Sequence, residues 1–303
     1  MQAIIGVDGS EQGWEAMRQA AALLSPGKDR IALYYAPPKV SVRSSRPDLD
    51  VVAQARARLV DAVFDEALVH LPAPFHAGVT RIVGEQAARH GLKLAADQCH
   101  AGLVVVGTKG LGQITGLLLG SVTRSVLRGT TRPILVARPR PIDHKPGGFR
   151  VLWAVEGAPQ TSTPIEFLQQ LNWPQDTTAQ VMHVVDPLTG MEVPDWFEKR
   201  VGHDDTFSVA WQAEYEDDKR RTLDELASFT TKLPRPFGGL PVLLEGNPAN
   251  MILRKASDEK VDLVIIGTRD LGTVQRLILG STAETVLQYA NCSVLVLHLP
   301  NKP

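Results

Sequence analysis

The sequence predicts an α/β protein that consists of two tandem, doubly wound domains, each with a parallel sheet. Two observations lead to this class. Short apolar runs alternate with stretches of helical periodicity, and runs such as residues 103–106 (LVVV) are apolar at every position, as in strands covered on both faces. The second half of the chain then repeats the first. Alternating strands and helices favour parallel βαβ units with right-handed crossovers.

The repeat is clearest in the two segments that begin at Leu103 and Leu263. LVVVGTKGLGQITGLLLGSVTRSVL aligns with LVIIGTRDLGTVQRLILGSTAETVL without a gap, at an offset of 160 residues. We therefore expect one domain at residues 1–139 and a second at residues 149–303. The segment between them, residues 140–148, is rich in Pro and Gly and is expected to be a linker.

Each element of the first domain follows from this pattern. Strands are expected at residues 3–8, 31–36, 77–83, 102–107 and 133–138, and helices near residues 11–24, 48–71, 85–99 and 119–128. Ser10 precedes the first helix and Ser121 opens the last one. Their hydroxyl groups are suited to cap the free N–H groups of a helix start.

The second domain contains an additional stretch at residues 187–222. It holds five aromatic residues among many charged ones: Trp196, Phe197, Phe207, Trp211 and Tyr215. We expect a longer amphipathic helix and a loop that cover part of the domain. A lid or a partner surface is the alternative.

Composition excludes several classes of function. The 32 basic and 33 acidic residues leave a net charge of −1, which predicts neither nucleic-acid nor membrane binding. The two cysteines, Cys99 and Cys292, form no disulfide framework, and no segment reaches the roughly 18 apolar residues of a membrane helix. We expect a cytoplasmic protein.

The scattered histidines predict no metal site, and no Ser/His/Asp set predicts a catalytic centre.

The residues that could bind a ligand follow two strands. Asp8 follows the first strand, and Gly107 ends the fourth, followed by Gly110 and then by Gly120-Ser121 at a helix start. Ligands of open α/β sheets bind beyond the carboxyl ends of the strands. A carboxylate at one side and N–H groups at a helix N-terminus at the other suit a nucleotide. Tight turns that bind nothing would explain the glycines equally well.

The combination of these motifs resembles the universal stress protein family. The resemblance rests on Asp8-Gly-Ser10, on Gly84 after the third strand, and on the pattern G-x2-G-x9-G-[ST] at residues 107–121. The resemblance covers nearly all of the chain, because each half carries one copy of the pattern. It implies doubly wound domains of the adenine nucleotide alpha hydrolase-like type, with strand order 3-2-1-4-5. One branch of the family binds ATP or AMP, and the glycine pattern marks that branch.

The resemblance also implies which residues contact the nucleotide. Asp8 would contact adenine or ribose, the backbone near Ala36 the adenine ring, and Val106 the base. The remaining contacts, to ribose and phosphates, would come from Gly107, Gly110, Gly120, Ser121, Val122 and Thr123. ATP or AMP, with or without Mg²⁺, is the implied cofactor.

The second copy departs from this pattern in ways that oppose phosphate binding. Asp270 stands where the first copy has Gly110, and Glu156-Gly-Ala158 stands where it has Asp8-Gly-Ser10. We therefore expect the first domain to bind nucleotide and the second to bind it poorly or not at all.

The last strands of the two domains are apolar and would otherwise be open sheet edges, so we expect them to pair. A homodimer of such tandem chains is the expected assembly. A regulatory, stress-response nucleotide-binding protein is the leading hypothesis. A weak ATPase or nucleotidyl-transfer enzyme, and a structural stress module that binds no nucleotide, are the alternatives.

Overall fold

The N-terminal half forms a five-stranded parallel sheet in the order that the resemblance implies. The computed structural model describes residues 1–38, 49–108, 119–139, 147–158, 161–186, 205–269 and 279–299. The strands of this half are β1 (Gln2–Gly6), β2 (Arg30–Tyr35), β3 (Val79–Val83), β4 (Leu103–Gly107) and β5 (Ile134–Ala137). They lie in the order β3-β2-β1-β4-β5, and all four neighbouring pairs are parallel. The helices are α1 (Glu11–Ala22), α2 (Leu49–His70), α3 (Ala88–Gln98) and α4 (Ser121–Leu127), with a 3-10 helix, η1 (Ala73–Gly78), before β3.

The C-terminal half repeats this topology. Its strands are β6 (Arg150–Ala154), β7 (Thr178–Val185), β8 (Val242–Glu245), β9 (Leu263–Arg269) and β10 (Ser293–Leu299), in the order β8-β7-β6-β9-β10. The helices are α5 (Thr163–Gln170), α7 (Asp205–Thr230), α8 (Pro248–Asp258) and α9 (Ser281–Tyr289). The predicted doubly wound α/β class and strand order are therefore confirmed in both halves.

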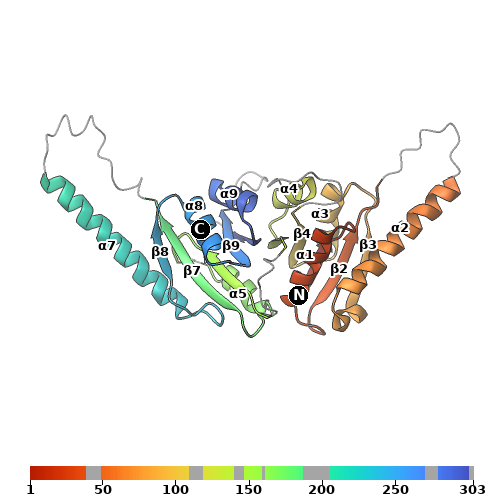
Figure 1. Cartoon of the computed structure of the whole chain (residues 1–303), viewed down its shortest axis with the longest axis horizontal. Helices are drawn as coiled ribbons and strands as arrows, with labels where there is room; N and C mark the ends of the chain where they lie inside the picture. Colours follow the sequence, from red (N-terminus) through yellow and green to blue (C-terminus); the bar gives the residue numbers. More distant parts are fainter. Residues whose placement is uncertain are drawn as a thin grey trace, which may run out of the picture.

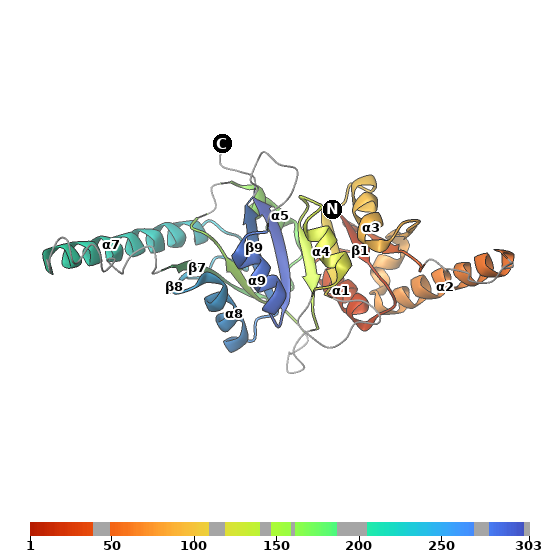
Figure 2. The same ribbon diagram turned by 90° about the horizontal axis from the view of Figure 1, so that it is seen from above.

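The two halves join through their last strands into one ten-stranded sheet (Figures 1 and 2). β5 and β10 are antiparallel, and Leu135 pairs with Leu295 at the middle of the register. The predicted pairing of these two edges is confirmed. Both side chains are buried, and each fully buried aliphatic side chain stabilises a fold by roughly 1.5–3 kcal/mol. Separating the halves would expose such residues on both strands, so the seam is a part of the core.

Alternate residues of each strand pack against opposite helical layers, as the two-residue period of a strand requires. Leu33 and Leu295 belong to the core beneath α1, α2, α5 and α7. Tyr34 and Val294, one position away, belong to the core beneath α3, α4, α8 and α9. Each layer therefore contains helices from both halves.

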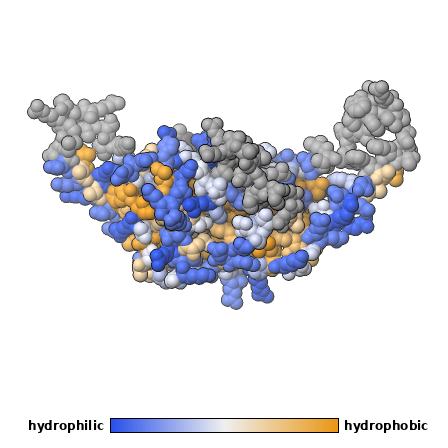
Figure 3. Space-filling view, turned by 180° about the vertical axis from the view of Figure 1, so that it is seen from behind, coloured by the Kyte–Doolittle hydropathy of each residue, from blue (hydrophilic) through white to orange (hydrophobic). Residues whose placement is uncertain are grey.

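Two long helices, α2 and α7, project outward at the two ends of the sheet (Figure 1). α2 has 22 residues and α7 has 26, which correspond to lengths of about 33 and 39 Å. Phe229 of α7 is buried, whereas Val209 near its start is 68% exposed. The predicted helix in the additional stretch is thus present from Asp205, and residues 187–204 lie outside the described part. The face seen from behind mixes hydrophobic and hydrophilic surface (Figure 3).

Candidate functional site

Asp8 lies just beyond the carboxyl end of β1, where its carboxylate is held by the next turn. Its Oδ1 accepts a hydrogen bond from Ser10 N at 3.1 Å and another from Ser10 Oγ at 2.5 Å. Ser10 has extended backbone dihedrals and caps α1, because its Oγ accepts from Gly13 N at 3.1 Å. A Cβ atom at Gly13 would lie 3.1 Å from Asp8 Oδ1, so a glycine lets the helix approach the carboxylate. The predicted cap by Ser10 is confirmed.

Gly107 ends β4 against the first turn of the same helix. A Cβ atom at this position would lie 3.1 Å from the carbonyl oxygen of Gln12. β1 and β4 are neighbours, with Ile5 paired to Val105. The structure therefore brings Asp8 and Gly107 to the same place, on either side of the start of α1.

Two hydrogen bonds connect the end of β4 to the start of α4. Gly120 N donates to Thr108 O at 2.7 Å, and Thr123 Oγ1 donates to Gly107 O at 2.8 Å. Thr123 is buried, whereas Ser121 is exposed. The expected capping role of Ser121 is wrong: Gly120 is the N-cap, and Ser121 is the first helical residue. The first N–H groups of α4, which include those of Ser121 and Val122, have no intrahelical acceptor and are suited to an anion.

Ala36 follows β2 and is half-buried. Tyr34 O accepts from Val7 N on the β1 side, and Tyr35 O accepts from Gly84 N on the β3 side. Consecutive residues of a strand direct their backbone groups to alternate sides. Ala36, two residues after Tyr34, is therefore suited to present its backbone groups toward the end of β1. A planar base with hydrogen-bonding edges could meet them there.

The other residues predicted to contact the nucleotide differ in burial. The Val106 side chain is buried in the core beneath α3 and α4, so its side chain is not at the open edge. Val122 is half-buried and packs against the same core. Gly110 lies outside the described residues. Burial raises the pKa of the Tyr35 phenol, and the charge of the Asp8 carboxylate raises it further.

Gly84 has a packing role that the sequence does not reveal. A Cβ atom there would collide with the phenol oxygen of Tyr34, and a Cβ atom at Gly91 of α3 would do the same. The Tyr34 side chain is 3% exposed, and its Oη has no hydrogen-bond partner within the described residues. The two glycines thus form the space that the phenol occupies.

The equivalent edge of the C-terminal half has a different local structure. Ala283 occupies the position of Thr123, so the hydrogen bond from the helix to the strand end is lost. β9 continues through Thr268 to Arg269, where it still pairs with β10, whereas β4 ends at Gly107. Thr268 is therefore part of the sheet in the second half, whereas its counterpart Thr108 lies beyond the end of β4. Ala283 is a departure that sequence reasoning missed, although the ungapped repeat displays it.

The first helix of the C-terminal half also begins farther from its acidic residue. α1 begins three residues after Asp8, and α5 begins seven residues after Glu156. Ser162, the N-cap of α5, makes no side-chain cap hydrogen bond. His183 Nδ1 lies 2.8 Å from Val155 O and 3.2 Å from Gly157 N, next to Glu156. In the N-terminal half, by contrast, Ser10 links the Asp8 carboxylate to the start of α1.

Comparisons with known proteins agree with this architecture. The sequence model of the universal stress protein family matches residues 1–138 and again residues 149–298. A universal stress protein of Methanocaldococcus jannaschii is 45% identical over 60 residues, which cover 20% of this chain and 35% of that protein. A universal stress protein of Thermus aquaticus is 49% identical over 55 residues, 18% of this chain and 40% of its own. These matches thus span about two fifths or less of the curated relatives.

Solved structures share this fold over nearly the full length of the chain. The crystal structure of a universal stress protein from Archaeoglobus fulgidus covers 98% of both chains, with a TM-score of 0.59 and 17% identity. A Pseudomonas aeruginosa protein described as functionally unknown covers 98% of this chain, with a TM-score of 0.58 and 14% identity. At such identities the structures show the shared fold alone. The two family matches together cover almost the whole sequence, and the chain belongs to the universal stress protein family.

Proposed function

We propose that this protein binds an adenine nucleotide, ATP or AMP, at the carboxyl edge of its N-terminal half. The observation that carries the proposal is the meeting of three elements around the start of α1. The Asp8 carboxylate lies on one side, Gly107 lies on the other, and the start of α4 is tied to the end of β4 by Thr123. The carboxylate can accept hydrogen bonds from ribose or adenine, and the helix N-terminus suits phosphate.

In this proposal, residues 1–139 and 149–303 are the two domains, and residues 140–148 link them. The C-terminal domain binds nucleotide poorly or not at all. Support comes from the loss of the Thr123 hydroxyl at Ala283, from Glu156 and Asp270 at the acidic and phosphate ends, and from the extension of β9 to Arg269. Both ends of the site therefore depart from the N-terminal pattern.

In this proposal the protein acts in the stress response, and the nucleotide stabilises one of its conformations. Mg²⁺ would bind together with the phosphates. A ligand that binds only one conformation stabilises it by mass action. Among the helices of the described residues, none is long and apolar enough to cross a membrane. Cytoplasmic location and homodimerisation are parts of the proposal that fractionation and sedimentation would test.

Isothermal titration calorimetry with ATP on two matched variants tests the site. Ser121→Glu places a carboxylate at the start of α4, and Ser281→Glu makes the same change at the start of α9. One unit charge at ~4 Å from phosphate, with an effective dielectric constant of ~20, opposes binding by about 4 kcal/mol. That corresponds to roughly a thousandfold loss of affinity. A glutamate at a helix start is favourable for the helix itself, so both variants should fold.

The proposal predicts that Ser121→Glu abolishes ATP binding and that Ser281→Glu leaves it unchanged. Unchanged affinity in a folded Ser121→Glu variant would remove the site from Ser121. Steady-state phosphate release from ATP distinguishes a binding protein from a weak ATPase, since a pure binder releases no phosphate.

A further inference from the structure

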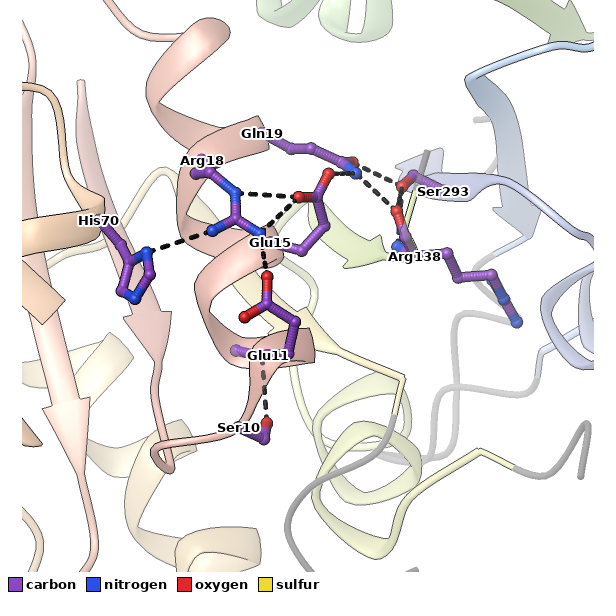
Figure 4. A network of polar contacts seen from close by, with 9 residues as sticks. Ser10, Glu11, Glu15, Arg18, Gln19, His70, Arg138 and Ser293 are labelled. Atoms are coloured by element: carbon purple, nitrogen blue, oxygen red, sulfur yellow. Dashed lines mark hydrogen bonds and ion pairs between the residues drawn. The ribbon is translucent and has the colours of Figure 1, made fainter. Parts of the chain in front are cut away.

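A buried polar cluster joins the two halves at the seam, next to the start of β10 (Figure 4). It consists of Gln19 of α1, Arg138 after β5 and Ser293 of β10. Ser293 Oγ donates to Gln19 Oε1 at 2.6 Å, Gln19 Nε2 donates to Arg138 O at 2.6 Å, and Arg138 N donates to Ser293 Oγ at 2.9 Å. Gln19 is 2% exposed and Ser293 is 1% exposed. The bond between Ser293 and Gln19 is buried, and the two bonds to the Arg138 backbone are partly buried. Removing one of the two buried side chains leaves the polar group of the other unsatisfied.

The Arg138 side chain extends the cluster into the C-terminal half. Its guanidinium donates to Leu287 O near the end of α9 and to Cys292 O, the latter at 3.2 Å. A cation at a helix C-terminus is stabilised by the helix dipole. One residue of the N-terminal half therefore holds the end of α9 and the start of β10 together.

α1 connects this cluster to the candidate site. Gln19 Nε2 also donates to Glu15 Oε1 at 2.7 Å, and Arg18 bridges Glu15 and Glu11 one turn earlier (Figure 4). The helix starts at Ser10, which holds the Asp8 carboxylate. Gln19 is nine residues from this cap, a distance of about 14 Å along one continuous helix. The helix is therefore one continuous connection between the cap at Ser10 and the seam.

The opposite connection, from the C-terminal half back to the N-terminal half, is not built in the same way. At the repeat offset of 160 residues, Pro133 corresponds to Ser293 and has neither a hydroxyl nor an N–H group. His298 corresponds to Arg138, and its Nδ1 lies 2.8 Å from Thr268 Oγ1 within its own half. The repeat therefore reproduces neither the cluster nor the candidate site: both use residues whose counterparts at the 160-residue offset differ.

We propose that the Gln19–Arg138–Ser293 cluster couples ligand binding at Asp8 to the stability of α9 and β10, so that the N-terminal half binds and the C-terminal half responds. The identity of the ligand rests on the proposed function, whereas the coupling between Asp8 and the seam does not. Such coupling requires a measured linkage between the two sites, because proximity along a structure does not demonstrate it.

Hydrogen–deuterium exchange on the full chain, with and without ATP, measures this linkage. At an ATP concentration 100 times the dissociation constant, openings that release the ligand become about 100-fold rarer. We expect exchange to slow by up to that factor in α9 and β10, as well as in β1 and α1. In Ser293→Ala and Gln19→Leu, the slowing should remain in β1 and α1 and disappear in α9 and β10, with ATP affinity within about twofold of the unaltered protein.

Thr230→Ala is the matched control. Thr230 is also a buried hydroxyl of the C-terminal half, 2% exposed, but it donates to Ala227 O inside α7 and lies off the seam. This variant should keep the full slowing in α9 and β10. Slowing confined to the N-terminal half of the unaltered protein, or equal slowing in Ser293→Ala, would overturn the coupling.

A second arm without nucleotide separates this proposal from the proposed function. Asp8→Ala removes both hydrogen bonds that Asp8 accepts from Ser10. Introduced alone, it should speed exchange in α9 and β10. Introduced into the Ser293→Ala variant, it should leave exchange in α9 and β10 unchanged. The same acceleration in both backgrounds, or none in either, contradicts the coupling. Absence of any ATP effect, together with the expected response to Asp8→Ala, would instead refute nucleotide binding and leave the coupling intact.

Discussion

Tyr34 of β2, Gly84 after β3 and Gly91 of α3 form a packing unit, and a double-mutant cycle can measure it. In Gly91→Ala, the new methyl group would lie far inside van der Waals distance of Tyr34 Oη and 3.2 Å from Cζ. The phenol has no room to retreat, because Gly84 closes the other side and the ring is buried. Overpacking of a well-packed core costs about 1–3 kcal/mol.

Helix propensity acts in the opposite direction. Gly91 lies inside α3, where alanine is favoured over glycine by about 1 kcal/mol. We therefore expect Gly91→Ala to destabilise the protein by up to about 2 kcal/mol in the unaltered background. Tyr34→Phe removes a buried hydroxyl that has no hydrogen-bond partner within the described residues, and such a group costs about 1–3 kcal/mol when buried. Tyr34→Phe should be neutral or stabilising.

The combination of the two substitutions tests the reasoning. Without the phenol oxygen, the nearest ring atom is Cζ at 3.2 Å, a contact that a shift of a few tenths of an ångström relieves. Gly91→Ala should then become neutral or stabilising, so that the coupling free energy between the two sites is about 1–3 kcal/mol. Urea unfolding of the four proteins, followed by circular dichroism, measures it. Additive effects within about 0.5 kcal/mol would refute the steric account of these glycines.

Three further predictions concern the site and the seam. Ser10→Ala should cost about 1 kcal/mol of stability through loss of the α1 cap and should weaken ATP binding by releasing Asp8, whereas Ser10→Thr should retain both in calorimetry and urea unfolding. Thr123→Val removes the hydrogen bond to Gly107 O and should lower the free energy of unfolding by about 1–3 kcal/mol; an unchanged midpoint would contradict it. Burial raises the pKa of the Cys292 thiol from 9.0 to about 11, so the folded state binds the proton more tightly than the unfolded state. Stability should therefore fall between about pH 9 and 11 by up to about 3 kcal/mol, and Cys292→Ala should flatten this slope.

The strands and helices of this protein could be predicted because their local signals agree with their burial. The run at residues 103–106 is apolar throughout, and β4 is buried on both faces. The β5–β10 pairing also followed from sequence, since two apolar edges with a common repeat leave few other arrangements. Ser10 was identified as a cap because its hydroxyl and the following residues form a local signal that needs no tertiary contact.

The parts that could not be predicted depend on tertiary contacts. Ser121 resembles a cap in sequence, but the hydrogen bond from Gly120 N to Thr108 O fixes the chain one residue earlier. Gly84 fits a ligand motif, while its immediate contact is the phenol of Tyr34. The extension of β9 to Arg269 depends on its pairing with β10, which no residue in the loop signals by itself.

Calorimetric titration of the unaltered chain with ATP tests the central claim most directly, because it counts the sites. The N-terminal half has the Asp8–Ser10 pair and the Thr123–Gly107 bond, and the C-terminal half has Glu156, Ala158 and Ala283 in their place. The account predicts a stoichiometry of one ATP per chain. Two equivalent sites per chain, or no measurable binding, would contradict it.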